Sequence, residues 1–445
     1  MKIQEFIEDL LGPDLPIGVR AYDGTVMGPA DPPATLVIRS KDALRWIATS
    51  PGEIGFARAY VAGDFEIEGD IHAFVELHKR LPNIKLSPRQ WWMALKLIGL
   101  HNLRPVTPPA EEAKPQRDRH SRASDAAAIA HHYDVSNDFY RIILGPSMTY
   151  SCAVFESDSD PLDQAQAKKH DLICRKLGLG QGDRLLDIGC GWGALSLHAA
   201  KHYRASVVAI TVSDRQVRYA RDWVRREGLA DRVEIRFQDY RDVDDGPFDA
   251  VSSVGMFEHV GVARMSEYFS KVYALLRTGG RFLNHAISRR PFQTEALARS
   301  GFPNRYVFPD GELIEAGRIL SSMQQAGFEA RHLENLREHY VLTLKHWCRN
   351  LEARWDAAVA ASSIGRARVW RLYLAGSASR FVGDWIRVNQ ILAVKTEVGH
   401  GTSGMPLRPD WDGSPPPGRN RETAKYGLVL PAKRSSPPPP HSALL

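Results

Sequence analysis

The middle of the chain alternates short apolar segments with amphipathic ones, and this alternation constrains the fold more than any other feature of the sequence. Strands are predicted over 184–188, 206–212, 233–237, 248–254 and 281–285. Helices are predicted over 192–203, 214–227 and 264–277, and a turn at 278–280. Because strands joined through helices pair in parallel, the sequence predicts an α/β fold with a doubly wound, mostly parallel sheet.

Composition divides the rest of the chain. Residues 1–103 mix helical and strand-like pieces and predict a smaller α+β domain, a candidate for contact with lipid. Residues 104–124 hold four prolines, many charges and almost nothing to bury, which is typical of a linker. We expect a catalytic domain over 125–399. The last segment, 400–445, holds ten of the 28 prolines and is predicted to be a largely disordered tail.

Overall composition excludes several classes of protein. A hydrophobic share of 43% with 25% charged residues excludes wholesale disorder and a fibrous repeat. No apolar run reaches the ~18 residues of a membrane span, and the N-terminus turns acidic early, so we expect a cytoplasmic protein. The four cysteines form no CxxC pair, and no metal site is predicted. A net charge of +6 suits an anionic membrane or nucleic acid and is diagnostic of neither.

A glycine-rich segment, LDIGCGWG at 186–193, lies between a predicted strand and helix. A tight strand-to-helix turn can need glycine for steric reasons alone, so the loop by itself is weak evidence for a ligand. A dinucleotide enzyme places an acid at the end of the second strand, yet no carboxylate follows that strand until Asp214. Asp187 instead precedes the loop, where it would repel a pyrophosphate and tolerate a sulfonium. The pattern favours S-adenosylmethionine over NAD.

Several motifs together resemble one family. They are HYDVSNDFY at 132–140, TYSCA at 149–153, LDIGCGWG, Thr211 to Ser213 with Gln216, FEHVG at 257–261, HAI at 285–287, and Tyr340. On these segments the chain resembles the cyclopropane-fatty-acid synthases, a family that includes mycolic-acid cyclopropane synthases and methyl- or methylene-branching enzymes. The resemblance implies a seven-stranded class I methyltransferase sheet with helical lid insertions. The N-terminal region resembles, less specifically, the extra domain of longer bacterial members.

In such enzymes the alkene of an unsaturated phospholipid acyl chain attacks the sulfonium methyl group and leaves a carbocation. Loss of a proton from the new methyl closes a cyclopropane, whereas loss from elsewhere leaves a methylene branch. The resemblance implies bicarbonate as the base, held through the backbone of Cys152 and Ile287 and the side chains of Glu258, His285 and Tyr340. Taken singly, the three side chains could equally be a surface carboxylate, a core histidine and a core tyrosine.

The resemblance also implies the residues that hold S-adenosylmethionine. They are Tyr150, Ser151, Gly189, Gly191, Thr211, Gln216, Asp239, Tyr240 and Arg241, beside the Asp187 already singled out. Asp239 is the natural acceptor for the exocyclic amine of adenine, although a solvent-facing acid would look the same.

One position departs from the family. Many members carry a cysteine in a C-terminal helical motif where this chain has Ser377. The chemistry requires no thiolate, but the change makes a methylene- or methyl-branched product a live alternative to a ring. A methyltransferase acting on a soluble small molecule and a non-catalytic binding protein are the other hypotheses. A homodimer is compatible with the resemblance, as is a separate reductase for a methylene intermediate.

Two segments bear on how the enzyme would reach its lipid. The apolar run 91–100 is either a core helix or an interfacial one. The segment from Arg337 to Arg387 contains nine lysines and arginines and four acidic residues. In the same segment Trp347, Leu351 and Trp355 follow a helical spacing. This region is either a packed face with solvated charges or a platform for anionic head groups. We expect a peripheral protein at the inner membrane face, with no nucleic-acid partner.

Overall fold

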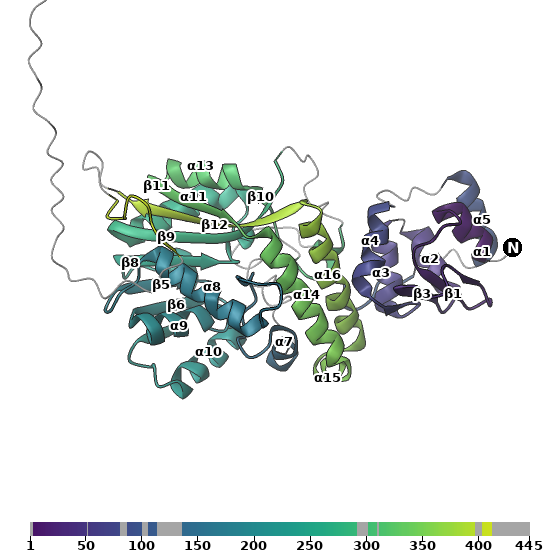
Figure 1. The fold of residues 1–445 in the computed structure, drawn as a ribbon, viewed down its shortest axis with the longest axis horizontal. Coiled ribbons are helices and arrows are strands. Elements are labelled where there is room, and N and C mark those ends of the chain that lie inside the picture. The colour runs from purple at the N-terminus through teal and green to yellow at the C-terminus, as the bar shows by residue number, and fades with distance from the viewer. Residues whose placement is uncertain are drawn as a thin grey trace, which may run out of the picture.

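A computed structural model describes residues 3–50, 52–80, 87–99, 106–113, 136–291, 301–308, 311–396 and 403–411. The N-terminal part is a four-stranded sheet in the order β2–β1–β3–β4, with helices around it (Figure 1). Its strands are β1 (Gly18–Ala21), β2 (Val26–Met27), β3 (Ala34–Ile38) and β4 (Phe65–Gly69). Its helices are α1 (Ile3–Leu11), α2 (Asp42–Thr49), α3 (Glu53–Ala62), α4 (Ile71–Arg80) and α5 (Pro88–Ile98).

The second sheet has the order β11–β12–β9–β8–β5–β6–β7, and the short β10 (Ile314–Glu315) pairs with the end of β9. Its strands are β5 (Arg184–Ile188), β6 (Ser206–Thr211), β7 (Val233–Phe237), β8 (Phe248–Val254), β9 (Leu276–Arg289), β11 (Phe328–Asn335) and β12 (Ile386–Lys395). All pairs are parallel except those of β12, which runs antiparallel to both of its neighbours.

Helices cover both faces of this sheet (Figure 1). One face carries α8 (Leu162–Leu177), α9 (Ala194–Tyr203) and α10 (Asp214–Arg226). The other carries α11 (Met265–Leu275) and α13 (Ala316–Gln325). Each face has its own apolar core, because the central strands are buried on both sides. The predicted doubly wound α/β sheet is therefore confirmed.

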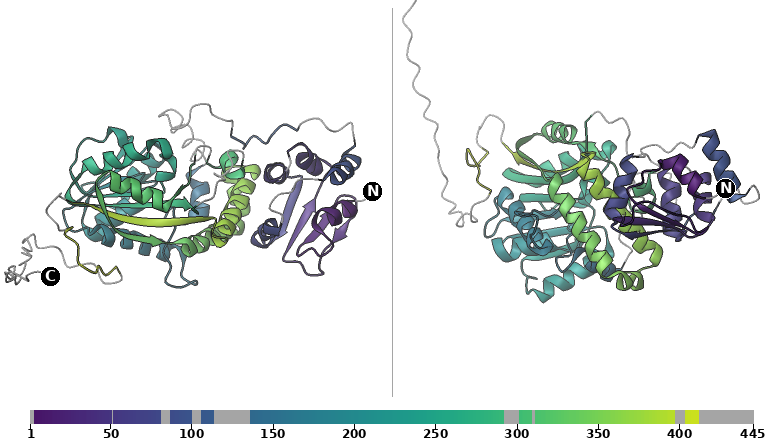
Figure 2. Two further views of the ribbon diagram at one scale, coloured as in Figure 1. Left: turned by 90° about the horizontal axis from the view of Figure 1, so that it is seen from above. Right: turned by 45° about the vertical axis from the view of Figure 1, so that its right-hand side comes forward.

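A group of helices lies between the two sheets (Figures 1 and 2). It comprises α7 (Asn137–Leu144), α14 (Arg337–Ala353), α15 (Trp355–Ala361) and α16 (Ile364–Val382). Helix α16 packs on α14 along one side and on α3 and α4 along the other. Short helical segments complete the described chain: α12 (Phe302–Tyr306) and the 3₁₀ turns η2 (Tyr240–Asp242), η3 (Phe257–His259) and η4 (Val262–Arg264).

Buried arginines join the N-terminal part to α16. Arg371 donates to the carbonyls of Ile67 at 2.7 Å and Gly69 at 3.1 Å, and to the Glu352 carboxylate at 2.7 Å. Arg368 pairs with Glu66 at 2.7 Å. Ile67 is buried and would lose this partner if Arg371 were absent, so the two parts depend on each other for satisfied hydrogen bonds.

Three sequence-based predictions are corrected in detail. The turn at 278–280 lies inside β9, where a register shift between Phe248 and Ala250 of β8 lets these residues bulge without ending the strand. The helix predicted from 192 begins at Ala194, because Gly191 and Gly193 both have left-handed backbone angles. The strand predicted to end at 212 ends at Thr211.

The linker and the tail are partly packed. Glu112 in the linker is nearly buried and accepts hydrogen bonds from Arg58 and Arg305, each at 2.7 Å. Residues 403–411 of the tail lie against the second sheet, where the Trp411 carbonyl accepts from Arg175 at 2.7 Å. The remaining linker and tail residues, and residues 132–135 of the HYDVSNDFY motif, lie outside the described part of the chain.

The two segments considered for membrane contact are largely packed. Helix α5 buries Met93, Ala94 and Ile98, although Trp92 on its other side is 55% exposed. Trp347 and Leu351 on α14 are fully buried and belong to a core face, whereas Trp355 begins the next helix, α15, and is only partly buried. No helix among the described residues combines the length and apolarity needed to cross a bilayer.

Candidate active site

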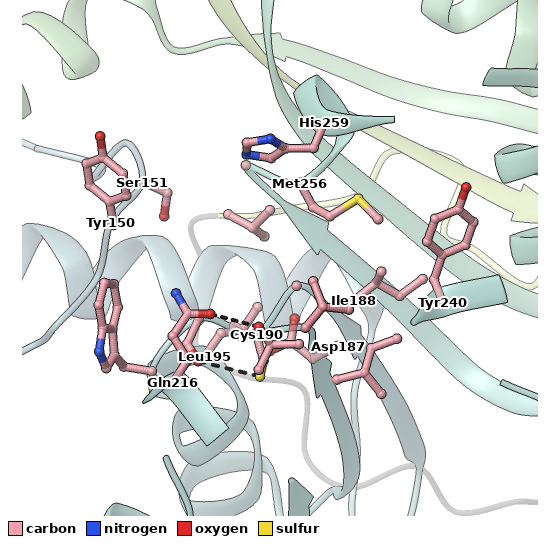
Figure 3. A pocket seen from close by; sticks show the side chains of 18 of the residues that line it. Tyr150, Ser151, Asp187, Ile188, Cys190, Leu195, Gln216, Tyr240, Met256 and His259 are labelled. Carbon is pink, nitrogen blue, oxygen red and sulfur yellow. Dashed lines mark hydrogen bonds between the residues drawn. The ribbon is translucent and has the colours of Figure 1, made fainter. Parts of the chain in front are cut away.

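A cavity opens beyond the carboxyl ends of β5, β6 and β8. Strand β5 lies where the sheet order reverses, and ligands of open α/β sheets bind at such a switch point. We call it the donor cavity. All ten residues predicted to hold S-adenosylmethionine line it: Tyr150, Ser151, Asp187, Gly189, Gly191, Thr211, Gln216, Asp239, Tyr240 and Arg241. Figure 3 shows Tyr150 and Ser151 on one side of this space and Tyr240 on the other.

The glycine loop forms the floor of the donor cavity. Gly189 has φ +78°, and a Cβ there would lie 2.9 Å from Cβ of Met256, so only glycine fits. Gly191 also has a left-handed φ of +57°, but a Cβ there would meet no atom within 4 Å. Its Cα therefore faces open space, which leaves room for a ligand to approach the backbone.

Asp187 braces this loop from beneath. Its carboxylate accepts from the Ser196 hydroxyl at 2.7 Å and the Ser252 hydroxyl at 2.8 Å, and it is 2% exposed. Burial raises the pKa of Asp187 above its usual range, and the two serine hydroxyls oppose that shift. The aspartate thus ties β5 to α9 and β8 at the point where the loop begins.

Two polar pairs fill the adjacent wall. The Thr211 hydroxyl donates to Oε1 of Gln216 at 2.7 Å, one of the dashed contacts of Figure 3. Asp239 forms a two-point ion pair with Arg241, at 2.8 and 2.7 Å, and is mostly buried. Asp239 is therefore not the solvent-facing acid that the sequence left open.

The cavity also contains residues that sequence reasoning missed. Lys169 is 1% exposed and donates to the Ser151 hydroxyl at 2.9 Å. Burial lowers the pKa of Lys169 to about 7, while Cys152 and Asp187 oppose that shift. Its position on the apolar side of α8, four residues before Ile173, was the available signal. Trp192 lines the cavity and donates to Asn137 at 2.9 Å, which gives one residue of the HYDVSNDFY motif a bracing role.

A second cavity adjoins the first, and Tyr150, Ser151, Gly255 and His259 line both. We call it the acyl cavity, for its largely apolar wall. All five residues predicted to act in catalysis line it: Cys152, Glu258, His285, Ile287 and Tyr340. Residues that the sequence did not single out also contribute, among them Asn304, Phe308, Tyr373, Arg380 and Phe381.

Glu258 is held at one side of the acyl cavity. Its Oε1 accepts from the Ile287 amide at 2.8 Å, and its buried Oε2 has no hydrogen-bond partner among the described residues. Burial raises the pKa of Glu258 to about 7. The Ile287 N–H thus already donates its hydrogen bond to Glu258, whereas the resemblance implies that the backbone of Ile287 holds bicarbonate directly.

His285 and Cys152 contribute in different ways. His285 is 2% exposed, and its Nε2 is buried without a hydrogen-bond partner among the described residues. Burial holds the pKa of His285 well below its usual range, so the ring is neutral. The Cys152 thiol is fully buried, and burial raises its pKa far above the ordinary range, so it is no nucleophile. This agrees with an expected role through its backbone.

Tyr340 and Tyr373 face the same cavity from α14 and α16. The Tyr340 ring packs 4.7 Å from that of Phe381. Burial raises the pKa of Tyr373 to about 12, and the neighbouring side chains of Tyr150 and Ser377 oppose that shift. Ser377 therefore occupies the polar side of this cavity, close to a tyrosine hydroxyl.

The two ligands expected from sequence suit these cavities. The donor cavity offers open glycine backbone, hydroxyl and carboxylate groups, which suit a nucleoside with an amino-acid tail. In the acyl cavity, the unpartnered Oε2 of Glu258 and Nε2 of His285 suit a small oxygen-rich ion. Among the described residues no cluster of side chains suits a metal ion.

A doubly wound sheet with one antiparallel strand, β12 between β11 and β9, and a cavity at the β5 switch point defines a class I S-adenosylmethionine-dependent methyltransferase. The family described as mycolic acid cyclopropane synthetase matches residues 120–391, and the chain belongs to that family.

Individual relatives agree with this assignment. A probable fatty acid methyltransferase of Mycobacterium tuberculosis is 44% identical over 89% of this chain and 95% of its own. The tuberculostearic acid methyltransferase UfaA1 of the same organism is 35% identical over 84% of this chain and 87% of its own. The crystal structure of mycolic acid cyclopropane synthase CmaA1 with SAH and CTAB is 33% identical, with a TM-score of 0.58, over 61% of this chain and 98% of its own.

Proposed function

We propose that the protein transfers the methyl carbon of S-adenosylmethionine to the double bond of an unsaturated phospholipid acyl chain, giving a cyclopropane. The observation that carries this proposal is the junction of the two cavities at Tyr150 and Ser151. A polar donor cavity and an apolar one that share a wall can bring a sulfonium methyl group to an alkene without water.

The chemistry needs a base that does not capture the cation. The alkene π electrons form the new C–C bond while the S–C bond breaks toward sulfur, leaving S-adenosylhomocysteine and a carbocation on the chain. We propose that bicarbonate takes a proton from the new methyl group, and that the released C–H pair closes the ring. Glu258 Oε2 and His285 Nε2 would hold this ion, and Tyr340 lies in the same cavity.

A branched product is the second candidate, and Ser377 favours it. Its hydroxyl lies beside Tyr373 in the acyl cavity, where it changes the polarity around the cation. Two full-length relatives are named as fatty acid methyltransferase and tuberculostearic acid methyltransferase, which supports the same alternative. The branch would arise when the cation loses a chain proton, and a separate reductase would then saturate the methylene.

One incubation separates these candidates. The purified protein is given S-adenosylmethionine labelled in its methyl group, together with vesicles of a monounsaturated phospholipid. Label in the acyl chain supports the proposal, and label only in a water-soluble product would replace it with a small-molecule methyltransferase. Because ring and methylene branch share a mass, fragmentation or chemical reduction of the fatty acid distinguishes them. Bound but untransferred donor would indicate a non-catalytic protein.

We propose further that the substrate reaches the acyl cavity from an anionic bilayer at the end of α16. Trp385 is 57% exposed and Val382 48% exposed, and they flank Arg380, Phe381 and Ile386, which line the acyl cavity. Exposed apolar side chains at a cavity that takes an acyl chain suit the interface of a membrane.

The variant Trp385→Ser tests this entrance. It is expected to weaken sedimentation with anionic vesicles several-fold and to lower turnover on vesicles, with turnover on detergent-dispersed lipid retained. Trp92→Ser is the matched control, because Trp92 is 55% exposed but lies on α5 in the N-terminal part. Equal losses in both variants, or none in Trp385→Ser, would place the entrance elsewhere. Binding that does not weaken with salt would argue against an electrostatic contribution.

A further inference from the structure

A row of polar side chains crosses three neighbouring strands behind the acyl cavity, buried except at its outer end, Glu334. His285 on β9 is directly opposite Gln390 on β12, which is directly opposite Glu334 on β11. Lys176 reaches this row from α8 and contacts both Gln390 and Glu334. His285, Gln390 and Lys176 are all almost fully buried, so their hydrogen bonds are not exchanged with solvent.

The donors and acceptors in this row leave one consistent arrangement. Lys176 donates to Gln390 Oε1 at 2.7 Å, and it pairs with the Glu334 carboxylate, which only accepts. The oxygen of the Gln390 amide must therefore face Lys176, and its nitrogen must face His285. The amide nitrogen lies 3.2 Å from Nδ1 of His285. Since an amide nitrogen only donates, Nδ1 accepts and the ring proton is on Nε2.

We propose that Gln390 and Lys176 are positioning residues that hold His285 as the tautomer with its Nε2–H directed at the acyl cavity. In this state the ring offers one hydrogen-bond donor at the atom that has no partner among the described residues. The opposite tautomer would present a lone pair there and would repel an anion. Neither Gln390 nor Lys176 lines the cavity, so both act through His285.

The charges around His285 support a neutral donor. Burial, together with Lys169 and Lys176, holds the pKa of the ring well below its usual range. A neutral Nε2–H can hold a bicarbonate oxygen without giving up its proton to it, so the ion keeps its basicity for the substrate. This last step rests on the function proposed above, whereas the tautomer itself does not.

Nitrogen NMR of protein labelled with ¹⁵N-histidine tests the tautomer directly, with the His285 signals assigned by their loss in His285→Asn. The wild type is expected to show a protonated Nε2 and an unprotonated Nδ1. In Gln390→Glu a carboxylate would accept from Nδ1, so the proton is expected to move there. In Gln390→Leu neither nitrogen has a fixed partner, and a mixture of tautomers is expected.

Binding of ¹³C-bicarbonate and turnover are then measured on the same variants. We expect the dissociation constant for bicarbonate to rise at least tenfold in Gln390→Glu, and kcat to fall with little change in KM for S-adenosylmethionine. Asn389→Asp is the matched control, because Asn389 is a buried amide next in the strand that contacts Ser288 at 2.7 Å and not His285. Unchanged binding of S-adenosylhomocysteine shows that each variant is folded.

The outcomes separate the inference from the proposed function. A wild-type His285 protonated on Nδ1, or a Gln390→Glu variant with unaltered tautomer and bicarbonate affinity, overturns the inference even if acyl chains are methylated. A wild type that binds no bicarbonate refutes the function proposed for that ion, while the NMR result still decides the tautomer.

Discussion

At the residue scale, the acyl cavity keeps its polar groups in the protonation states that burial favours. Glu258 has one oxygen bound to the Ile287 amide and one directed to the cavity, and His285 is neutral. A carboxyl with a pKa near 7 is partly protonated and partly ionised at neutral pH. In the proposed mechanism such a group would accept a proton from bicarbonate and release it in the next cycle.

Glu258→Gln tests the raised pKa through stability. Because the folded-state pKa of about 7 exceeds the usual 4.5, ionising this carboxyl destabilises the folded state. The contribution of the protonated Glu258 carboxyl to the free energy of unfolding is complete below pH 4.5 and is lost as the pH rises to about 7. The variant should therefore gain stability relative to wild type across that window, by on the order of 3 kcal/mol at pH 8.

Urea unfolding at pH 5 and pH 8 measures this effect, and Glu267→Gln is the control, because Glu267 is an exposed partner of Arg264. Turnover should fall at least a hundredfold in Glu258→Gln. A stability difference that is the same at both pH values would show that Glu258 ionises normally in the folded protein.

At the element scale, the glycine loop after β5 decides whether the donor can approach. Met256 leaves no room for a side chain at position 189, whereas Gly191 faces open space. The two glycines thus have separate roles, one in packing the loop and one in leaving room for a ligand. The brace from Asp187 to Ser196 and Ser252 holds the loop in this position.

Gly191→Ala is expected to weaken S-adenosylhomocysteine binding at least tenfold, because the added methyl enters the donor cavity. The left-handed backbone should also cost about 1 kcal/mol of stability. Gly182→Ala is the control, since Gly182 has φ +82° with nothing within 4 Å of its Cβ and does not line the cavity. Calorimetric titration measures the affinities. Equal affinity in the two variants would mean that the ligand does not approach Gly191.

At the scale of the whole molecule, α16 connects the N-terminal sheet to the wall of the acyl cavity. One side of the helix carries Arg368 and Arg371, which bind β4, and the other carries Tyr373 and Ser377. Glu112 adds a second connection by binding Arg58 on α3 and Arg305 on α12. Among the described residues, the N-terminal part does not line the acyl cavity, but it packs against the helix that does.

Arg371→Met is expected to destabilise the protein by about 3 kcal/mol, because it leaves the carbonyls of Ile67 and Gly69 and the Glu352 carboxylate without their partner. Arg349→Met on the exposed side of α14 is the control and should change stability little. Thermal unfolding followed by circular dichroism measures both. A loss below 1 kcal/mol in Arg371→Met would show that other groups satisfy the hydrogen bonds of the Ile67 and Gly69 carbonyls and the Glu352 carboxylate.

Local patterns in the sequence were enough to predict the doubly wound sheet and the glycine loop, whereas most residues around the two cavities were predicted from the resemblance to a family. These features are local: hydrophobic periodicity sets a strand or helix, and short motifs at strand ends fall at one edge of a parallel sheet. The turn at 278–280 was predicted wrongly because its glycines are typical of a chain reversal, whereas in the fold Leu276 and Arg281 on either side of it both pair with β8.

The remaining features of the site depend on contacts between distant parts of the chain. The tertiary structure showed that Lys169 is buried beside Ser151, that the Ile287 amide is held by Glu258, and that Gln390 and Lys176 stand behind His285. These contacts join residues up to 214 positions apart, and their protonation states depend on burial. The physical reason is that a side chain's ionisation and hydrogen bonding are set by its neighbours in space, and sequence periodicity does not specify those neighbours.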